Sequence, residues 1–95
     1  MPAYVVAVVN VKDPVQYQEY AKLAPAAVEK FGGKFLARGS IHAVFEGGLG
    51  ANRVVVTEFP STEAATSFYN SPEYQAARLN RVGVADFTMM LLDGI

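Results

Sequence analysis

The segments with the strongest strand pattern carry apolar residues on both faces. Residues 4–9, YVVAVV, have no polar position, and residues 87–92, FTMMLL, have a single hydroxyl. An antiparallel strand with one face in water alternates apolar and polar side chains. Because these segments do not alternate, both faces of their sheet should be covered. About two helices are present to cover one face, so we expect a second copy of the protein on the other.

The same pattern divides the rest of the chain into alternating elements. Strands are predicted over residues 3–11, 34–46, 53–59 and 85–93, where Val, Ile, Tyr and Phe are enriched. Gly39-Ser40 suggests a bulge or bend inside the second strand. The glycine-rich residues 47–52 should form the flexible connection to the third.

Capping residues mark the helices between these strands. Asp13 can cap a helix that has Pro14 in its first turn and that ends at Gly32-Gly33. Pro25 should kink or split this helix, because proline removes a backbone donor. Ser61 can cap a second helix. A short third helix is predicted to follow the turn at residues 70–73.

The element order predicts an α+β, ferredoxin-like βαββαβ fold with a four-stranded antiparallel sheet. The first and third strands would be central, and both main helices would lie on one face. At 95 residues the chain should form a single domain, residues 1–95. The uncovered face would be an apolar patch larger than monomers usually expose, which again predicts a homodimer through the sheet faces.

Composition narrows the partners and the chemistry. The chain is 52% hydrophobic, has a net charge of −1 and contains no cysteine. The charge gives no attraction to nucleic acid or to an anionic membrane, and the lack of cysteine excludes disulfides, thiolate metal sites and cysteine nucleophiles. The N-terminus lacks a signal-peptide pattern, and the apolar runs are shorter than a membrane span. We expect a soluble, cytoplasmic protein that binds neither nucleic acid nor membrane.

Three spaced motifs resemble a known group of proteins. They are Asp13-Pro14 followed by Tyr17 and Tyr20, residues 32–39 (GGKFLARG), and residues 53–61 with 69–74 (RVVVTEFPS and YNSPEY). Together they resemble an uncharacterised family, a domain of unknown function, within the dimeric α/β-barrel superfamily. The resemblance implies a ferredoxin-like protomer whose sheet packs on that of a partner. It implies no established reaction. Other families of the superfamily include cofactor-free monooxygenases, lactone isomerases and haem-binding enzymes, and their functions transfer only by analogy.

Glu58 is the first candidate for chemistry. It lies on the predicted third strand and shares a face with Val54 and Val56. A carboxylate in apolar surroundings is rare unless it is paired, and it can serve as a general base. The alternatives are an ion pair near the end of the strand and an exposed position.

Arg38 and Arg53 are candidates for binding an anion. Arg38 lies beside Gly39 in an apolar stretch, where a guanidinium could hold a carboxylate or enolate oxygen. Its alternative is an ion pair with Glu58 or with a carboxylate of the other subunit. Arg53 begins the third strand next to the glycine-rich loop, and its alternative is a solvated turn residue.

His42 is the only histidine, and we expect it on the second strand near a hairpin. A lone histidine can transfer protons near neutral pH. A metal or haem site would need further ligands, and the carboxylates show no ligand spacing, so we expect no metal and no cofactor.

Tyrosines near the helix faces could line an apolar pocket and orient a ligand through their hydroxyls. Tyr17, Tyr69 and Tyr74 are the residues we expect there, and the alternative is a role in the core alone. Tyr69 and Tyr74 flank the turn at residues 70–73, where the mouth of a pocket could lie.

These candidates give one leading hypothesis and two alternatives. The leading hypothesis is a small-molecule-binding protein, a cofactor-free enzyme for proton transfer or oxygenation of an activated carbonyl or phenolic compound. In it Arg38 would hold an anionic oxygen, and Glu58 or His42 would move a proton. The alternatives are a non-enzymatic metabolite binder and a structural dimerisation module with no cavity. The sequence does not decide whether the protein is an enzyme.

Overall fold

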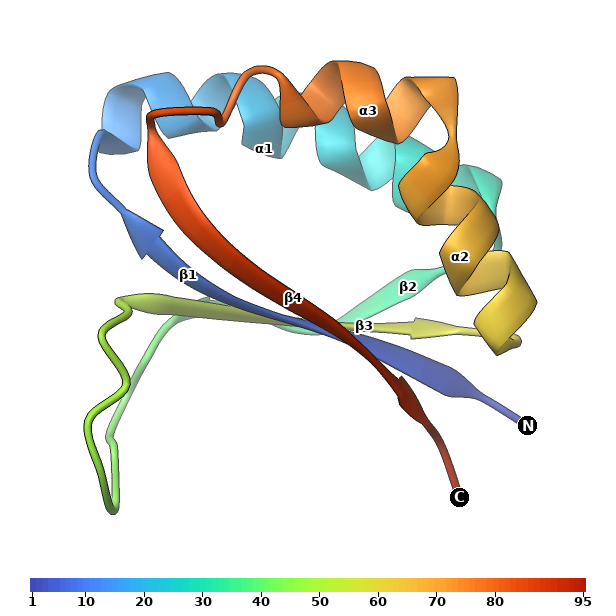
Figure 1. The fold of residues 1–95 in the computed structure, drawn as a ribbon, viewed down its shortest axis with the longest axis horizontal. Helices are drawn as coiled ribbons and strands as arrows, with labels where there is room; N and C mark the ends of the chain where they lie inside the picture. The colour runs from blue at the N-terminus through green and yellow to red at the C-terminus, as the bar shows by residue number, and fades with distance from the viewer.

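The computed structural model describes residues 1–95 and contains seven elements. In chain order they are β1 (Ala3–Val11), α1 (Pro14–Lys30), β2 (Lys34–Ser40), β3 (Arg53–Phe59), α2 (Thr62–Asn70), α3 (Pro72–Arg78) and β4 (Ala85–Asp93). The strands form one antiparallel sheet in the order β2-β3-β1-β4. All three helices lie on one face of this sheet (Figure 1). The predicted ferredoxin-like fold and its two central strands are therefore confirmed.

Capping begins each helix where the sequence predicts. The Asp13 side chain accepts a hydrogen bond from the backbone N–H of Gln16 at 3.1 Å, and Ser61 accepts one from Ala64 at 3.1 Å. Ser71 joins α2 to α3, because its hydroxyl donates to the carbonyl of Phe68 and accepts from the N–H of Tyr74. Such caps satisfy donors that a helix leaves free at its first turn.

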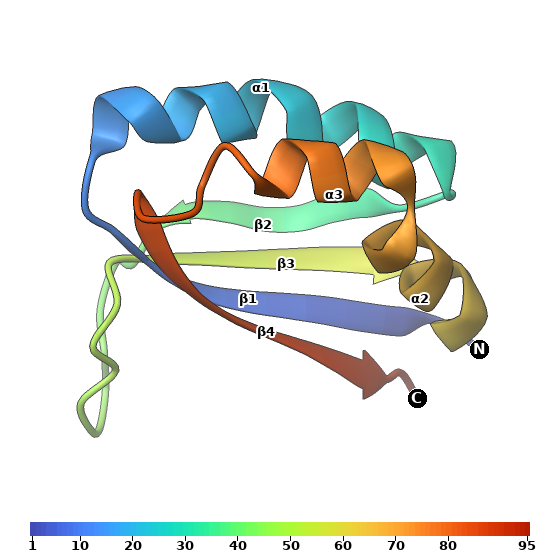
Figure 2. The same ribbon diagram turned by 45° about the horizontal axis from the view of Figure 1, so that its top comes forward.

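Of the two outcomes expected at Pro25, a split does not occur, since α1 runs through Pro25 as one helix. The expected extent of the second strand is wrong, because β2 ends at Ser40 and residues 41–52 form no strand. Ser40 already pairs with Arg53, the first residue of β3, so residues 41–46 could pair only with the glycine-rich residues 47–52. Glycine is poor at forming strands. The resulting loop projects to the side of the sheet opposite the helices (Figure 2).

The irregularity of β2 also lies earlier than expected. The pairing of β2 with β3 shifts between Phe35 and Ala37, which leaves Leu36 as the extra residue. The bulge is therefore at Leu36 and not at Gly39-Ser40. Because of it, every later residue of β2 lies on the opposite face of the sheet from the one it would occupy in a regular strand.

The core lies between the sheet and the helices. Val5 and Val9 of β1 are buried on this face, together with Phe59, Phe68 and Tyr74. The other face of the sheet has no covering element, and its central residue is Val6, which pairs with Val56 on β3 and with Met90 on β4. The apolar character of both faces is thus real, but a single chain covers only one of them.

Candidate functional site

Two cavities lie between the helices and the sheet. The first, of about 360 Å³, lies between α1 and strands β2 and β3, and is called here the β2-side cavity. The second, of about 390 Å³, lies between helices α2 and α3 and strand β4, and is called the β4-side cavity. They share a wall made of Val5, Phe68, Phe87 and Met89. Both volumes fall in the range of about 300–1,000 Å³ that is typical of ligand pockets.

The β2-side cavity is apolar, with polar groups concentrated on a few side chains. Hydrophobic residues make up 13 of the 17 that line it. No carboxylate lines this cavity.

The four lining residues of the β2-side cavity that are not hydrophobic are Pro25, Arg38, Arg53 and Thr57. The tyrosines that reach the cavity from the helices are Tyr17, Tyr20 and Tyr74. The cavity therefore offers two guanidinium groups and several hydroxyls inside an apolar enclosure.

The bulge at Leu36 brings Arg38 to this cavity. Phe35 pairs with Thr57 and Arg38 pairs with Val55, so both lie on the helix-covered face although they are three residues apart. In a regular strand, residues an odd number apart point to opposite faces. The extra residue restores the orientation of Arg38, whose guanidinium lies 4.3 Å from the centre of the Phe35 ring. Arg38 is exposed, so it stands at the mouth of the cavity beside the β2 edge.

Arg53 lies deeper than a solvated turn residue would. Its guanidinium is 5.6 Å from the centre of the Tyr17 ring, and its Nε is buried without a hydrogen-bond partner. Burial raises the pKa of the Tyr17 hydroxyl, and the positive charge of Arg53 partly opposes that rise. Tyr17 therefore presents a protonated hydroxyl next to a cation.

A hydrogen-bonded tyrosine pair closes the inner end of the β2-side cavity. The hydroxyls of Tyr20 and Tyr74 are 2.7 Å apart, and the Arg81 guanidinium donates to the Tyr74 hydroxyl at 3.3 Å. Burial, and then the proximity of Tyr74, raise the pKa of Tyr20 well above its usual value. Tyr20 therefore presents a neutral hydroxyl at neutral pH, and its hydrogen bond to Tyr74 fixes its position.

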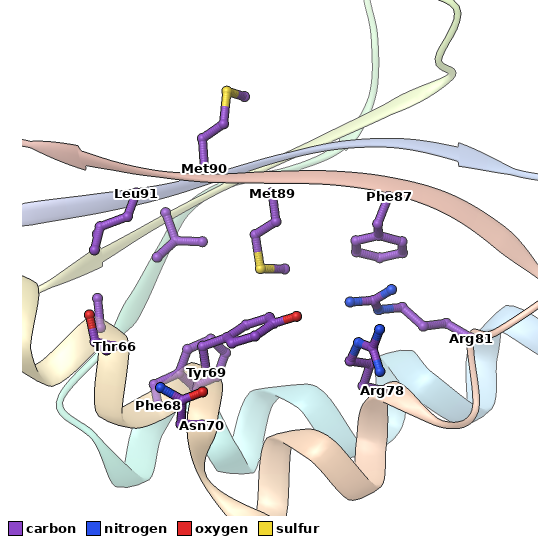
Figure 3. Close-up of a pocket in the computed structure, with 12 residues that line it drawn as sticks. Thr66, Phe68, Tyr69, Asn70, Arg78, Arg81, Phe87, Met89, Met90 and Leu91 are labelled. Carbon is purple, nitrogen blue, oxygen red and sulfur yellow. The ribbon is translucent and has the colours of Figure 1, made fainter.

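The β4-side cavity has a comparable composition (Figure 3). Hydrophobic residues make up eight of the 12 that line it, and the other four are Thr66, Asn70, Arg78 and Arg81. Figure 3 shows the side chains of Phe87, Met89 and Leu91 pointing into it from β4, whereas Met90 points to the opposite face. Tyr69 lines this cavity and not the other.

Arginine and lysine occupy different places in this protein. Each of the four lysines forms an ion pair, and none of them lines either cavity. Each of the four arginines lines a cavity, and none forms an ion pair with a carboxylate. The positive charges of the cavities are therefore not balanced by the protein itself.

Glu58 lies away from these cavities. It shares a face with Val54 and Val56 as expected, but that face is the open one, since Glu58 pairs with Tyr4. Its carboxylate is 3.5 Å from the Lys34 ammonium, and it lines only a shallow depression near the N-terminus. The structure thus shows an ion pair near the strand end, with Lys34 and not Arg38 as the partner.

His42 also lies elsewhere. It follows the end of β2, in the exposed loop of residues 41–52, and not on a strand. Of the residues expected around one ligand, Tyr17, Arg38, Arg53 and Tyr74 line the β2-side cavity, whereas Tyr69 lines only the β4-side cavity. Neither Glu58 nor His42, the expected proton-transfer residues, lines either cavity. No three His, Asp or Glu side chains come close enough to hold a metal ion.

Sequence reasoning missed Tyr20, Arg78 and Arg81 as lining residues. In the sequence, Tyr20 belongs to the apolar stripe of the first helix, which indicates a core residue. Only the fold shows that Tyr20 also lines the β2-side cavity. Arg78 is the last residue of α3 and Arg81 lies just after it, where a charged side chain is typical of a solvated surface. The one feature of the sequence that could have indicated Arg78 and Arg81 is that both are arginine and not lysine, since arginine is better suited to buried and stacked positions.

None of the helices combines the length and apolar character needed to cross a membrane.

Solved structures share the fold of this chain. A protein of unknown function from Rhodopseudomonas palustris is 21% identical, with a TM-score of 0.76, over 99% of this chain and 82% of that one. A dimeric ferredoxin-like protein of unknown function from Jannaschia sp. CCS1 is 11% identical, with a TM-score of 0.73, over 99% of this chain and 100% of that one.

SnoaB, a cofactor-independent oxygenase from Streptomyces nogalater, is 10% identical to this chain, with a TM-score of 0.73. The match covers 99% of this chain and 93% of SnoaB. No curated protein matches the sequence. A family model described as a domain of unknown function, DUF1330, matches residues 2–95. The resemblance seen in the sequence motifs is therefore confirmed, and the chain belongs to the DUF1330 family.

Proposed function

We propose that this protein binds a small organic anion in the β2-side cavity. One observation carries the proposal: two arginines, Arg38 and Arg53, line an apolar cavity that contains no carboxylate. The Nε of Arg53 is buried without a hydrogen-bond partner, which is costly, and a bound oxyanion would remove that cost. A guanidinium also matches the planar geometry of a carboxylate or an enolate.

The cavity walls favour a flat, unsaturated ligand. Phe35 and Tyr17 supply aromatic surface beside the guanidinium groups of Arg38 and Arg53, and Phe87 lines the same cavity. The tyrosine hydroxyls can fix the orientation of a ligand that has more than one oxygen. The ligand class that fits best is an activated carbonyl or phenolic compound, bound as its enolate or phenolate.

Binding is supported more directly than catalysis. No carboxylate or imidazole lines the cavity, so the protein supplies no conventional general base there. The second candidate is cofactor-free oxygenation, in which the arginines would stabilise the anion of the substrate. The shared fold with SnoaB favours it, but at 10% identity that likeness extends to the fold alone. A purely structural module predicts a filled core, and two cavities of ligand size argue against it.

We also propose that the protein is a homodimer, paired through the open face of the sheet. That face carries the adjacent apolar residues Val6, Val56 and Met90, and no helix covers it. A face of this kind is stable in water when a second apolar surface covers it. The structural relative described as dimeric has the same fold, which supports a second copy of this chain as the covering partner.

A coloured phenol tests the binding proposal. 4-Nitrophenol absorbs visible light only when ionised, so stabilisation of its anion by the cavity should lower its apparent pKa on binding. Arg38→Ala and Arg53→Ala should each weaken binding by about tenfold to hundredfold, since hydrogen bonds to charged groups contribute about 1.5–3 kcal/mol. Lys22→Gln is the matched control, because it removes one positive charge from the surface and from neither cavity.

Native mass spectrometry of gently purified protein gives an independent result, because a retained ligand would appear as added mass. The binding proposal is wrong if no small phenol, enol or carboxylate binds, or if both arginine variants bind as well as the wild type. Oxygen uptake with a bound phenol then separates the two candidates. Uptake that depends on Arg38 would favour the oxygenase, and binding without uptake would favour the binder.

A further inference from the structure

The geometry points to a second, separate ligand site in the β4-side cavity, for a small organic acid whose carboxylate is held by Arg78 and Arg81. This site goes beyond the proposed function, because it has its own arginine pair and its own opening.

Arg81 is the strongest evidence for a ligand. It is only 7% exposed, and its guanidinium lies 3.8 Å from the centre of the Phe87 ring. Its hydrogen bond to the Tyr74 hydroxyl fixes one end of the group, while its Nε–H is buried without a partner. No carboxylate lines the cavity or forms an ion pair with Arg81. A buried cation without a counter-ion is costly, and an anion bound beside Arg81 would remove that cost.

Arg78 places a second positive group at the same end of the cavity. Its Nε is also buried without a hydrogen-bond partner. Figure 3 shows the guanidinium groups of Arg78 and Arg81 close to one another below Phe87, with the Tyr69 hydroxyl directed toward that end. Two like charges repel each other in an apolar space. A carboxylate between them would bind both and leave one net positive charge in place of two.

The other end of the cavity sets the class of the acid. Met89 and Leu91 point into it from β4, and Phe68 and Tyr69 face them from α2 (Figure 3). An apolar lining favours an acid with a hydrocarbon or aromatic body over a bare inorganic anion. A ring attached directly to a carboxylate fits this division between a charged end and an apolar end.

The opening of the cavity separates this site from the β2-side cavity. Its exposed lining residues include Tyr69 and Leu91, which are 37% and 43% exposed and belong to α2 and β4. The mouth therefore lies along the β4 edge. Arg38 stands at the mouth of the other cavity, along the β2 edge. These are the two opposite edges of the sheet, so two ligands could enter without meeting.

An NMR titration with benzoate tests the site, because different residues report on each cavity. Thr66, Asn70 and Leu91 line only the β4-side cavity, whereas Ala21 and Val55 line only the β2-side cavity. Benzoate should cause saturable shifts in the first group. Benzamide, which has the same ring and no charge, should bind at least about tenfold more weakly, since it lacks the charge-assisted hydrogen bonds.

Two variants assign the effect to the arginines. Arg81→Met and Arg78→Gln should each weaken the benzoate shifts at Thr66 and Leu91 by about tenfold or more. Arg78 is only half-buried, so its variant remains informative if the loss of Arg81 prevents folding. Lys22→Gln is again the charge-matched control. A double variant, Arg38→Met with Arg53→Met, should leave these shifts unchanged.

The proposal is overturned if benzoate gives no saturable shift at Thr66 and Leu91, or if the Arg78 variant binds it as tightly as the wild type. It is also overturned if inorganic phosphate saturates these signals and benzoate does not. Absence of benzoate shifts at Ala21 and Val55 alone leaves this proposal standing, because these two residues report only on the β2-side cavity.

Discussion

The chemical difference between arginine and lysine explains where each is used in this protein. A guanidinium is planar, weakly hydrated and able to stack on rings, whereas an ammonium is strongly hydrated. Arg81 stacks on Phe87 in the interior, while Lys22 and Lys34 pair with carboxylates at the surface. Arginine is therefore the cation that can stay charged beside an apolar cavity, and the four arginines are the residues most worth testing.

The buried hydroxyl pair predicts an asymmetric response to mutation. Tyr74→Phe removes the partner of the Tyr20 hydroxyl and the acceptor of the Arg81 guanidinium. Tyr20→Phe leaves the Tyr74 hydroxyl bound to Arg81. An unsatisfied buried group costs about 1–3 kcal/mol, so Tyr74→Phe should lower the free energy of unfolding more than Tyr20→Phe does. Urea unfolding at pH 7 and fixed protein concentration measures both, and an equal or reversed effect would contradict the hydrogen-bond assignment.

At the level of elements, the cavities exist because the helices do not all lie directly on the sheet. Helix α1 packs mainly against α3, whereas α2 packs against β1, β3 and β4. Large side chains such as Tyr17 and Tyr20 fill part of the space beneath α1. The bulge at Leu36 then turns Arg38 toward the remaining space. Packing of helices and an irregular strand thus create the site together.

The junction between α1 and β2 leaves no room for a side chain at Gly33. A Cβ on Gly33 would lie 2.6 Å from the Phe59 ring and 2.8 Å from the Val28 side chain, and both residues are buried. Gly33→Ala should therefore lower the free energy of unfolding by about 1–3 kcal/mol, as overpacking does. Gly48→Ala is the control, because nothing lies within 4 Å of a Cβ there. Thermal or urea unfolding of both variants gives the comparison, and an equally stable Gly33→Ala variant would show that the junction can relax.

At the scale of the whole molecule, the open face of the sheet is the feature that a single chain leaves unexplained. Met90 and Leu92 of β4 are 40% and 49% exposed on this face, next to the half-buried Val6. The loop of residues 41–52 projects to the same side and carries Phe45, which is 97% exposed. Both features fit the proposed dimer, in which a second copy would cover the face.

A charge on the open face should break that dimer. Met90→Lys places an ammonium among apolar side chains of the proposed interface, and burial of an unpaired charge costs several kcal/mol. We expect the dissociation constant to rise by about hundredfold or more, since each factor of ten corresponds to about 1.4 kcal/mol. Val15→Lys is the control, because Val15 is exposed on α1 on the helical side. Sedimentation velocity measures both, and a monomeric wild type or a fully dimeric Met90→Lys variant would refute the interface.

Much of this fold could be predicted because its signals are local. Caps at Asp13 and Ser61, the double glycine after α1 and the apolar strand runs each act within a few residues. The sequence was less informative where the local structure depends on residues that are distant along the chain. Residues 41–46 have strand-like composition but are followed by a glycine-rich segment, and Pro25 lies inside one continuous helix although proline lacks a backbone donor.

The sequence by itself determined the order of elements, the family and the apolar character of both sheet faces, because these depend on side-chain periodicity and local backbone preferences. It also contained the residues of the site, including Tyr17, Arg38, Arg53 and Tyr74. Only the tertiary structure decided how they are grouped, since a one-residue bulge sends Arg38 to the helix-covered face while the regular alternation of β3 leaves Glu58 on the other. The face of a strand on which a side chain lies depends on register, and register is fixed by pairing with distant residues.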